Sequence, residues 1–335
     1  MTVMLLVLIL AAIVFDFLNG FHDSSNIVAT MISSRAVSAR VALAIVTFGE
    51  VAGPFIFGVA VATTVGHDVV AGGVSIVVVV AALIGAIVWN ILTWWLGIPS
   101  SSSHALFGGI IGAVAVEHGF GYLNIMGLKK VMFALFFSPI IGLVAGFVCQ
   151  RLLLHLLVGV RAGPGANRFF RGGQVFTALG LALSHGSNDA QKTMGMITMG
   201  LVATGFQTQF HVPWWVMGIS ALAIGAGTAT GGWRLIKTLG FGFYKIWPIH
   251  GFTAQAASAS VILGAALVGG PVSTTQVVSS VIVGAGASES VRKVRWQLAR
   301  NILTAWFLTI PAAGLVAGAA YFLVKFLMKV SGGQV

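Results

Sequence analysis

The sequence predicts an all-α polytopic membrane protein with two inverted-topology repeats, each with a broken helix and a re-entrant helical hairpin. Three observations support this fold class. Of the 335 residues, 58% are hydrophobic and only 7% are charged, whereas a soluble domain carries roughly 25% charged residues. Long apolar runs alternate with short basic loops, and two polar motifs of the first half recur in the second. A surface so poor in charge must largely face lipid.

The apolar runs define the expected membrane segments. A spanning helix needs ~20 residues. The stretch after Pro99, at 105–117, is too short to span, so we expect 73–117 to enter and leave the bilayer on one side. Residues 3–15 lack a basic leader and a cleavage pattern, so they are expected to form the first membrane helix. The runs cover 3–33, 41–65, 73–98, 131–150, 174–202, 213–233, 251–287 (the second hairpin) and 301–324.

Lys and Arg gather in alternate loops, which gives an expected orientation. Basic residues in short loops mark the cytoplasmic side. With those loops inside, the N- and C-termini and the loops at 66–72 and 203–212 lie outside, in a membrane expected to be a prokaryotic inner membrane. The net charge of +11 is then explained by these basic cytoplasmic loops, and no nucleic-acid-binding surface is expected. The basic loop residues are Arg35, Arg40, Arg151, Arg161, Arg168, Arg171, Arg234, Lys237, Arg292, Lys293, Arg295 and Arg300.

The two halves match at two separate places. Gly97-Ile-Pro-Ser-Ser-Ser-Ser-His-Ala105 aligns with Gly269-Gly-Pro-Val-Ser-Thr-Thr-Gln-Val277. Gly20-Phe-His-Asp23 aligns with Gly186-Ser-Asn-Asp189, and Asn26 with Lys192. We expect a first repeat at 1–158, a cytoplasmic linker at 159–173 and a second repeat at 174–335. The second half runs opposite to the first, which is typical of inverted-repeat secondary transporters.

The first motif pair supplies candidate substrate-binding residues. Each run follows a proline and precedes a short apolar helix, where hydroxyl side chains favour the helix start. Backbone N–H groups at that end have no partner within the helix and carry the positive end of its dipole. Two such ends with several hydroxyls suit a tetrahedral oxyanion, although capping of kinked helices is the alternative. The candidates are Ser101, Ser102, Ser103, His104, Ser273, Thr274, Thr275 and Gln276.

The second motif pair places Asp23 and Asp189 inside segments that must cross lipid. A charge at mid-bilayer costs ~3 kcal/mol or more, so such residues are normally functional. Gly20 and Gly186 are expected to break the helices and to free carbonyl oxygens. Carboxylates with amides and carbonyls suit a hard cation, so the two aspartates are metal candidates if a cation is bound. The alternative is a polar pair that holds helices together or lies at the membrane surface.

Other intramembrane polar residues are candidates for binding a coupling ion or a proton. Glu50 precedes Gly53-Pro54 in its apolar run and has no evident acidic counterpart. His185 adjoins the second motif and fits a proton relay. Asp16 aligns with Ala182, and its role stays open between structure and function. The remaining candidates are His22, Asn26, Asn188 and Lys192.

At these motifs the sequence resembles the PiT family of inorganic phosphate transporters. That family carries a Gly-x-Asn-Asp-x-x-Asn signature in each inverted half and Pro-x-Ser-Ser/Thr-Ser/Thr hairpin tips. The resemblance covers nearly the whole chain and is strongest to the compact bacterial low-affinity type. It implies phosphate symport driven by a cation gradient, with substrate at the hairpin tips and coupling ions near Asp23 and Asp189.

Two departures from that signature bear on coupling. His22 replaces Asn in the first half, and Lys192 replaces the last Asn in the second. An ammonium beside Asp189 would repel or replace Na⁺. We therefore expect proton coupling, with Na⁺ as the alternative, and phosphate carried alone or as a neutral complex with Mg²⁺ or another divalent metal. No cofactor is expected, and the lipid bilayer is the expected surroundings of the protein. Whether the protein forms a homo-oligomer is left open by the sequence.

Three other functions compete with this interpretation. Sulfate transport is the nearest, because hydroxyls and amides alone do not separate the two oxyanions. An intramembrane hydrolase would need contact between Ser103 and His104, but helix neighbours do not face each other. A passive channel is the third, although paired broken helices of opposite orientation favour alternating access.

Overall fold

The protein is described by a computed structural model that covers residues 2–98, 100–158, 164–233, 236, 240 and 242–330. Helices fill these ranges, no β-strand occurs within them, and the predicted all-α class is confirmed. Pro99, Arg161, Arg234 and Lys237 lie outside them. The helices are α1 (Thr2–Ser33), α2 (Ala39–Phe57), α3 (Ala60–Thr63), α4 (Ile76–Leu96), α5 (Ser102–His118), α6 (Ile125–Leu156), α7 (Pro164–Ala203), α8 (Trp214–Thr230), α10 (Pro248–Leu267), α11 (Thr274–Glu289) and α12 (Trp296–Val330), with short turns η1 (Thr64–Asp68), η2 (Phe120–Tyr122) and η3 (Val291–Lys293).

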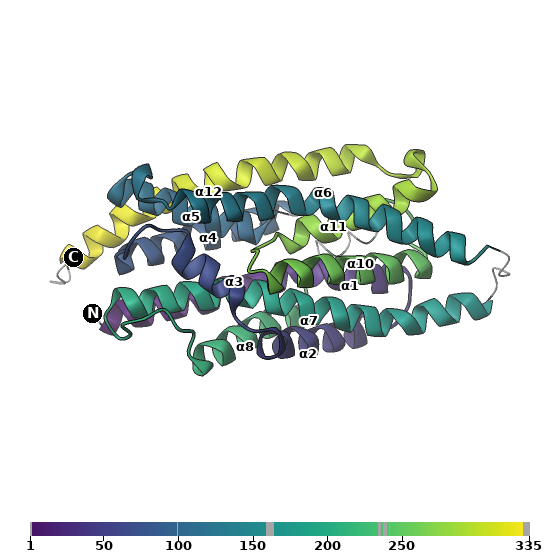
Figure 1. Ribbon diagram of the computed structural model, residues 1–335, viewed down its shortest axis with the longest axis horizontal. Coiled ribbons are helices and arrows are strands. Elements are labelled where there is room, and N and C mark those ends of the chain that lie inside the picture. The colour runs from purple at the N-terminus through teal and green to yellow at the C-terminus, as the bar shows by residue number, and fades with distance from the viewer. Residues whose placement is uncertain are drawn as a thin grey trace.

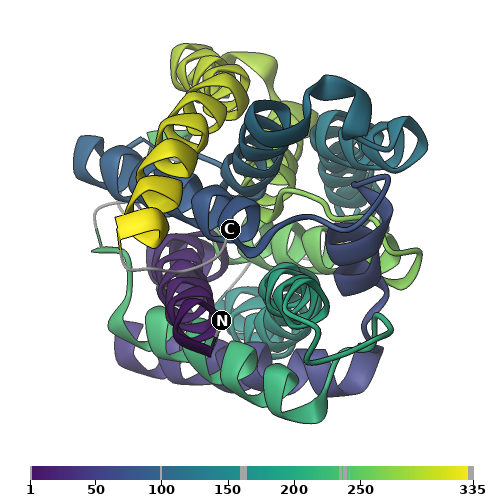
Figure 2. The ribbon, with the colours of Figure 1, turned by 90° about the vertical axis from the view of Figure 1, so that its left-hand side faces the viewer.

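The long helices run along one axis of an elongated bundle (Figure 1). Among the described residues, five helices are long and apolar enough to cross a membrane: α1, α2, α4, α6 and α12. Large apolar side chains such as Phe133 on α6 and Leu315 on α12 are exposed. Because such side chains are stable in lipid but unfavourable in water, the chain is an integral membrane protein. Both termini lie at one end of the bundle, which Figure 2 shows end-on.

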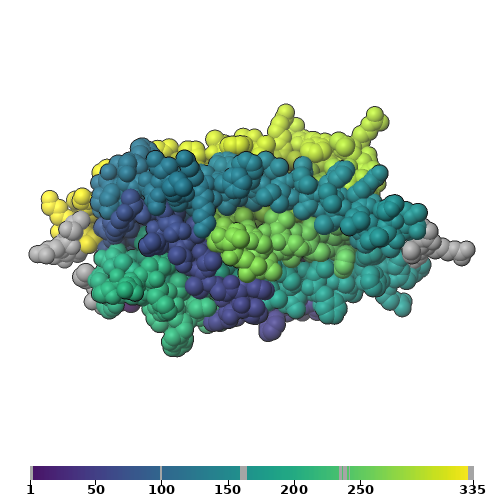
Figure 3. Space-filling view, in the orientation of Figure 1, coloured from purple at the N-terminus to yellow at the C-terminus, as the bar shows by residue number. Residues whose placement is uncertain are grey.

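Two helical hairpins, α4–α5 and α10–α11, match the predicted hairpins. The α4–α5 pair lies towards the end with the termini and α10–α11 towards the other end (Figure 1). Gly97 (φ 72°) and Gly269 (φ 71°) start the two turns in the left-handed region that favours glycine. The tips meet, because Ser103 Oγ donates a hydrogen bond to the Val272 carbonyl at 3.1 Å. Figure 3 shows α10 at the surface between α6 and α7, both of which it contacts.

Glycine contacts between helices recur at matched positions of the two halves. A Cβ on Gly20 would lie 2.0 Å from the Ile224 carbonyl oxygen, and one on the aligned Gly186 would lie 2.2 Å from that of Glu50. The same pairs of helices meet again three residues away. A Cβ on Gly227 of α8 would lie 1.9 Å from the α1 carbonyl oxygen of Phe17, and one on Gly53 of α2 would lie 2.2 Å from the α7 carbonyl oxygen of Leu183.

These paired contacts mean that α1 packs on α8 as α7 packs on α2. They support the predicted repeat and give Glu50 a counterpart, Ile224, which explains why no second acid was evident. The opposite orientation of the halves and the boundaries at 158 and 174 stay predictions. Residues 164–173, expected in the linker, form the first turns of α7.

The predicted helix breaks at Gly20 and Gly186 are wrong. Both α1 and α7 continue through these residues without interruption. The glycines serve close packing instead, since any side chain there would collide with a backbone carbonyl of the neighbouring helix. The interruptions inside the bundle lie at the hairpin tips and after Phe57, where Gly58 (φ 80°) ends α2 and the Gln191 side chain accepts hydrogen bonds from the first N–H groups of α3.

Candidate functional site

The predicted site residues lie on α1, α2, α7 and the tips of α5 and α11, and all are buried. The most exposed is Ser102, at 5%. Two apolar clusters flank this polar centre, one around α4, α5 and α12 and the other around α2, α10 and α11. Polar groups buried this deeply need hydrogen bonds or a bound partner.

The two hairpin tips start their helices in the same way. Ser101 Oγ accepts a hydrogen bond from His104 N at 3.1 Å, and Ser273 Oγ accepts one from Gln276 N at 3.3 Å. For these two serines the capping alternative therefore holds. The tips also touch through their side chains, because Gln276 Nε2 lies 3.2 Å from His104 Nε2. The free backbone N–H groups at the starts of α5 and α11 therefore lie close together in the interior of the bundle.

The tip of α11 is fastened to both aspartates. Thr275 Oγ1 donates to Asp23 Oδ1 at 2.7 Å, and Asn26 Nδ2 donates to the same oxygen at 2.8 Å. Thr274 Oγ1 lies 3.0 Å from an oxygen of Asp23 and 3.0 Å from an oxygen of Asp189. A hydroxyl has one proton and can donate to only one of them at a time. One of these two carboxylate oxygens therefore depends on a donor other than Thr274.

Lys192 connects α7 to both tips. Its fully buried ammonium donates to Asp189 Oδ1 at 2.5 Å, to Ser103 Oγ at 2.6 Å and to the Val272 carbonyl at 3.0 Å. These three bonds use all the donors of the ammonium. A fixed positive charge thus lies where the α5 tip, the α11 tip and Asp189 meet.

His185 lies among three carboxylates. Its Nε2 is 3.3 Å from Asp189 Oδ2 and 3.5 Å from Asp23 Oδ2, and its Nδ1 is 2.9 Å from Glu50 Oε1. Glu50 also accepts a hydrogen bond from Thr228, which in turn lies next to the Gly20 carbonyl. Ligand atoms of Asp23, His185 and Asp189 lie within 4.8 Å of one another, close enough to share a metal ion or a proton.

Three predicted residues lie apart from this network. His22 Nε2 donates to the Asn90 carbonyl of α4, and Asn188 Nδ2 donates to the Gly270 carbonyl. No side-chain hydrogen bond is described for Ser102. The sequence analysis missed Asn19, which donates to Asp189 at 3.4 Å, and Thr228. Asn19 lies four residues before Asp23 on the same face of α1, which is the signal that would have found it.

The hydrolase alternative has no support in the geometry. Ser103 bonds Lys192 and a carbonyl, whereas His104 Nδ1 lies 2.8 Å from Ser101 Oγ. The Ser103 hydroxyl and the His104 ring, which a hydrolase would have to pair, therefore do not contact each other.

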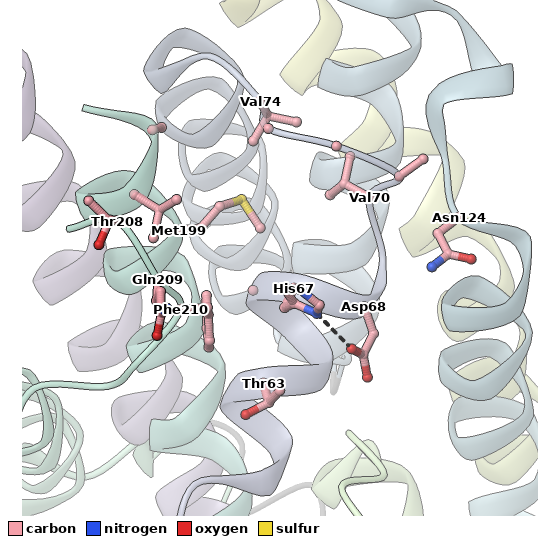
Figure 4. A pocket seen from close by; sticks show the side chains of 16 residues that line it. Thr63, His67, Asp68, Val70, Val74, Asn124, Met199, Thr208, Gln209 and Phe210 are labelled. Carbon is pink, nitrogen blue, oxygen red and sulfur yellow. Dashed lines mark hydrogen bonds and ion pairs between the residues drawn. The ribbon is translucent and has the colours of Figure 1, made fainter. Parts of the chain in front are cut away.

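A separate cavity of ≈ 1010 Å³ opens at the end of the bundle that holds both termini (Figure 4). It is lined by His67 and Asp68 of η1, the irregular loop at 70–74, and residues after α7 such as Phe210. None of the predicted site residues lines it. The loops 66–72 and 203–212 thus share one end of the molecule, as the predicted orientation requires.

A membrane-embedded helical bundle with a buried polar centre between two hairpin tips has the architecture of a membrane transporter. A family model described as the phosphate transporter family matches residues 19–317. The chain belongs to this family.

Named relatives agree with this assignment over nearly the full length. The chain is 40% identical over 329 residues to a probable low-affinity inorganic phosphate transporter of Bacillus subtilis, covering 97% of this chain and 98% of the relative. It is 43% identical to a protein of the same description from Rhizobium meliloti, covering 94% and 95%. A solved structure described as "The sodium-dependent phosphate transporter" has the same fold, with a TM-score of 0.87, 22% identity and coverage of 97% and 100%. These relatives are transporters, so the protein is not an enzyme.

Proposed function

We propose that this protein carries inorganic phosphate across the membrane together with protons. The named relatives are described as probable low-affinity inorganic phosphate transporters, which supports phosphate as the substrate. The observation that carries the proposal is the position of Lys192, whose ammonium joins Asp189 to both hairpin tips. There its positive charge would attract an oxyanion, and it would compete with Na⁺ for Asp189.

The anion would bind between the tips of α5 and α11. The donors would be backbone N–H groups at the two helix starts and the hydroxyls of Ser103, Thr274 and Thr275. In this structure those hydroxyls donate to the Val272 carbonyl and to the two aspartates, so each would have to turn from its present acceptor to the anion. Because the tips touch through Ser103 and Val272, binding requires them to part. Parting of the tips towards alternate ends of the bundle would give alternating access.

Carboxylates beside the anion distinguish phosphate from sulfate. HPO₄²⁻ carries an O–H that can donate to a carboxylate oxygen, whereas SO₄²⁻ has none. Asp23 contacts both threonines of the α11 tip and is the nearest acceptor of this kind. Protons taken up at Asp23, Glu50 and His185, or a divalent metal carried with phosphate, would offset the charge of the anion and lower the cost of enclosing it.

Na⁺-coupled phosphate symport is the second candidate. Three possible cation ligands lie within 4.8 Å of one another, on Asp23, His185 and Asp189. The protein of similar fold whose structure is solved is described as sodium-dependent. The two candidates differ at Lys192, because a bound Na⁺ and the ammonium would lie on the same carboxylate.

The orientation belongs to the proposal as well. The end of the bundle with Arg151, Arg171 and Arg292 would lie in the cytoplasm of a prokaryote and both termini outside its inner membrane.

The test is exchange of radiolabelled phosphate by the purified protein in proteoliposomes, with unlabelled phosphate, arsenate or sulfate as competitor and with or without Mg²⁺. We expect phosphate and arsenate to compete and sulfate not to. Thr275→Val is expected to raise the KM for phosphate, since it removes a donor at the tip, whereas Thr208→Val at the separate cavity serves as the control. Exchange of sulfate as fast as phosphate would contradict the proposal.

A further inference from the structure

Asp16 is a buried carboxyl group that none of the interactions above uses. It lies on α1, two helical turns before Asp23, and is 0% exposed. Neither of its oxygens accepts a hydrogen bond with suitable geometry from any described group. A buried carboxylate ion without donors is far less stable than the neutral acid.

The other three carboxylates of the centre have partners. Asp189 accepts from Lys192 at 2.5 Å, and Asp23 accepts from Thr275 at 2.7 Å. Glu50 accepts from Thr228 and lies 2.9 Å from a ring nitrogen of His185. Asp16 is thus the member of this group for which neither oxygen has a hydrogen-bond partner among the described residues.

Three charged side chains act on a carboxylate at Asp16: Glu50 and Asp189 carry the same charge, and Lys192 carries the opposite one. The ammonium of Lys192, however, already directs its three donors to Asp189, Ser103 and Val272. In the described part of the centre, four carboxylates face two cationic side chains, Lys192 and His185. Even with His185 protonated, two negative charges remain without a counter-charge.

A proton on Asp16 would also satisfy its neighbours. Asn19 Oδ1, one turn further along α1, and Thr193 Oγ1, beside Asp16 on α7, are buried and have no hydrogen-bond partner among the described residues. Protonated Asp16 has an O–H group that can donate to either oxygen. The carboxylate ion could accept from the Thr193 hydroxyl, but it has no proton to donate to the acceptor oxygen of Asn19, so only the protonated acid can satisfy Asn19.

We propose that Asp16 carries a transported proton at a position separate from the substrate tips. The proton binds a carboxylate oxygen of Asp16 on one side of the membrane and leaves that oxygen on the other. Asn19 links this position to the site, since its Nδ2 donates to Asp189 at 3.4 Å while its oxygen faces no donor. Loss of the proton would place a negative charge one side chain away from Asp189 and Lys192. The inference rests on the proposed proton-coupled transport of phosphate.

The test is the number of protons moved per phosphate, measured with the full-length protein in proteoliposomes. Steady-state accumulation of phosphate is recorded against the imposed pH difference with the membrane potential clamped. Asp16→Asn is permanently neutral and keeps the shape of the protonated acid. We expect it to lower the ratio by one proton and to retain phosphate exchange, which needs no net proton movement. Asp68→Asn, at the separate cavity, is the control and should keep the wild-type ratio.

An unchanged ratio in Asp16→Asn overturns the proposal. If Asp16→Asn abolishes exchange as well, Asp16→Glu decides: proton-driven accumulation restored by the longer acid supports a titrating role, and its absence overturns it. Wild-type protein that accumulates no phosphate in response to a pH difference overturns both this inference and the proposed coupling. If only the inference about Asp16 fails, the wild-type protein still accumulates phosphate in response to a pH difference, and the contradicting result is seen in the Asp16 variants alone.

Discussion

Replacement of Lys192 by methionine tests the electrostatic reasoning about the site. The ammonium is 0% exposed and lies 2.5 Å from Asp189 Oδ1. Methionine fills similar space but leaves Asp189 with Asn19 at 3.4 Å, a shared Thr274 hydroxyl and a ring nitrogen of His185 at 3.3 Å, which it shares with Asp23. Removal of one partner of a buried ion pair costs about 3–5 kcal/mol. We expect a loss of that size in the free energy of unfolding at neutral pH.

The assay is unfolding of the detergent-solubilised protein by titration with a denaturing detergent. Lys130→Met is the matched control, because Lys130 is 43% exposed and lies 3.8 Å from Asp68. A partly exposed pair of this kind contributes about 0–1 kcal/mol. In acid the unpaired Asp189 takes up a proton, so the deficit of Lys192→Met should shrink as the pH falls.

A double-mutant cycle isolates the pair. Addition of Asp189→Asn to Lys192→Met should cost less than the sum of the two single changes, since the neutral amide needs no counter-charge. The reasoning is refuted if Lys192→Met is as stable as Lys130→Met, or if its deficit does not depend on pH.

Two further predictions follow from packing and pH. Gly186→Ala should strongly destabilise the protein in the same unfolding assay, because its Cβ would lie 2.2 Å from the Glu50 carbonyl oxygen. Gly180→Ala on the same helix meets nothing within 4 Å and should raise the free energy of unfolding by about 0.5–1 kcal/mol. Equal effects of the two changes would contradict the explanation by close helix packing. Desolvation raises the pKa of Glu289, but His250 and Lys293 outweigh it and hold that pKa below the ordinary 4.5. The stability that these contacts contribute is present above pH 4.5 and is lost as the pH falls through the lowered pKa. Glu289→Gln should therefore be less stable than wild type at pH 7 but not in strong acid. A loss of stability in Glu289→Gln that does not depend on pH would contradict this prediction.

The hairpins could be predicted because their signals are local. A proline, a run of hydroxyl residues and an apolar stretch too short to span occur in both halves, and the structure has helix starts at Ser102 and Thr274. Burial of Asp23 and Asp189 followed from the cost of a charge in lipid. The prediction of membrane crossings likewise depended on composition and length alone.

The roles of Gly20 and Gly186 could not be predicted from one sequence. A glycine that frees the backbone and a glycine that admits a neighbouring helix look alike in sequence. Only the approach of the Ile224 and Glu50 carbonyls distinguishes the two cases. The contact of Lys192 with Asp189 was expected from their spacing, but its contacts with Ser103 and Val272 were not, because those residues lie far from it in the chain.

The most direct test of the central claim is uptake of radiolabelled phosphate into proteoliposomes under one ion gradient at a time. The account predicts accumulation driven by an inward proton gradient without Na⁺, and no accumulation driven by an inward Na⁺ gradient at equal pH on both sides. Lys192→Asn introduces the residue type that Asn26 has at the aligned position of the first half. Phosphate uptake by this variant should become responsive to an inward Na⁺ gradient. Uptake by the wild-type protein that requires Na⁺ and ignores the pH difference would contradict the account.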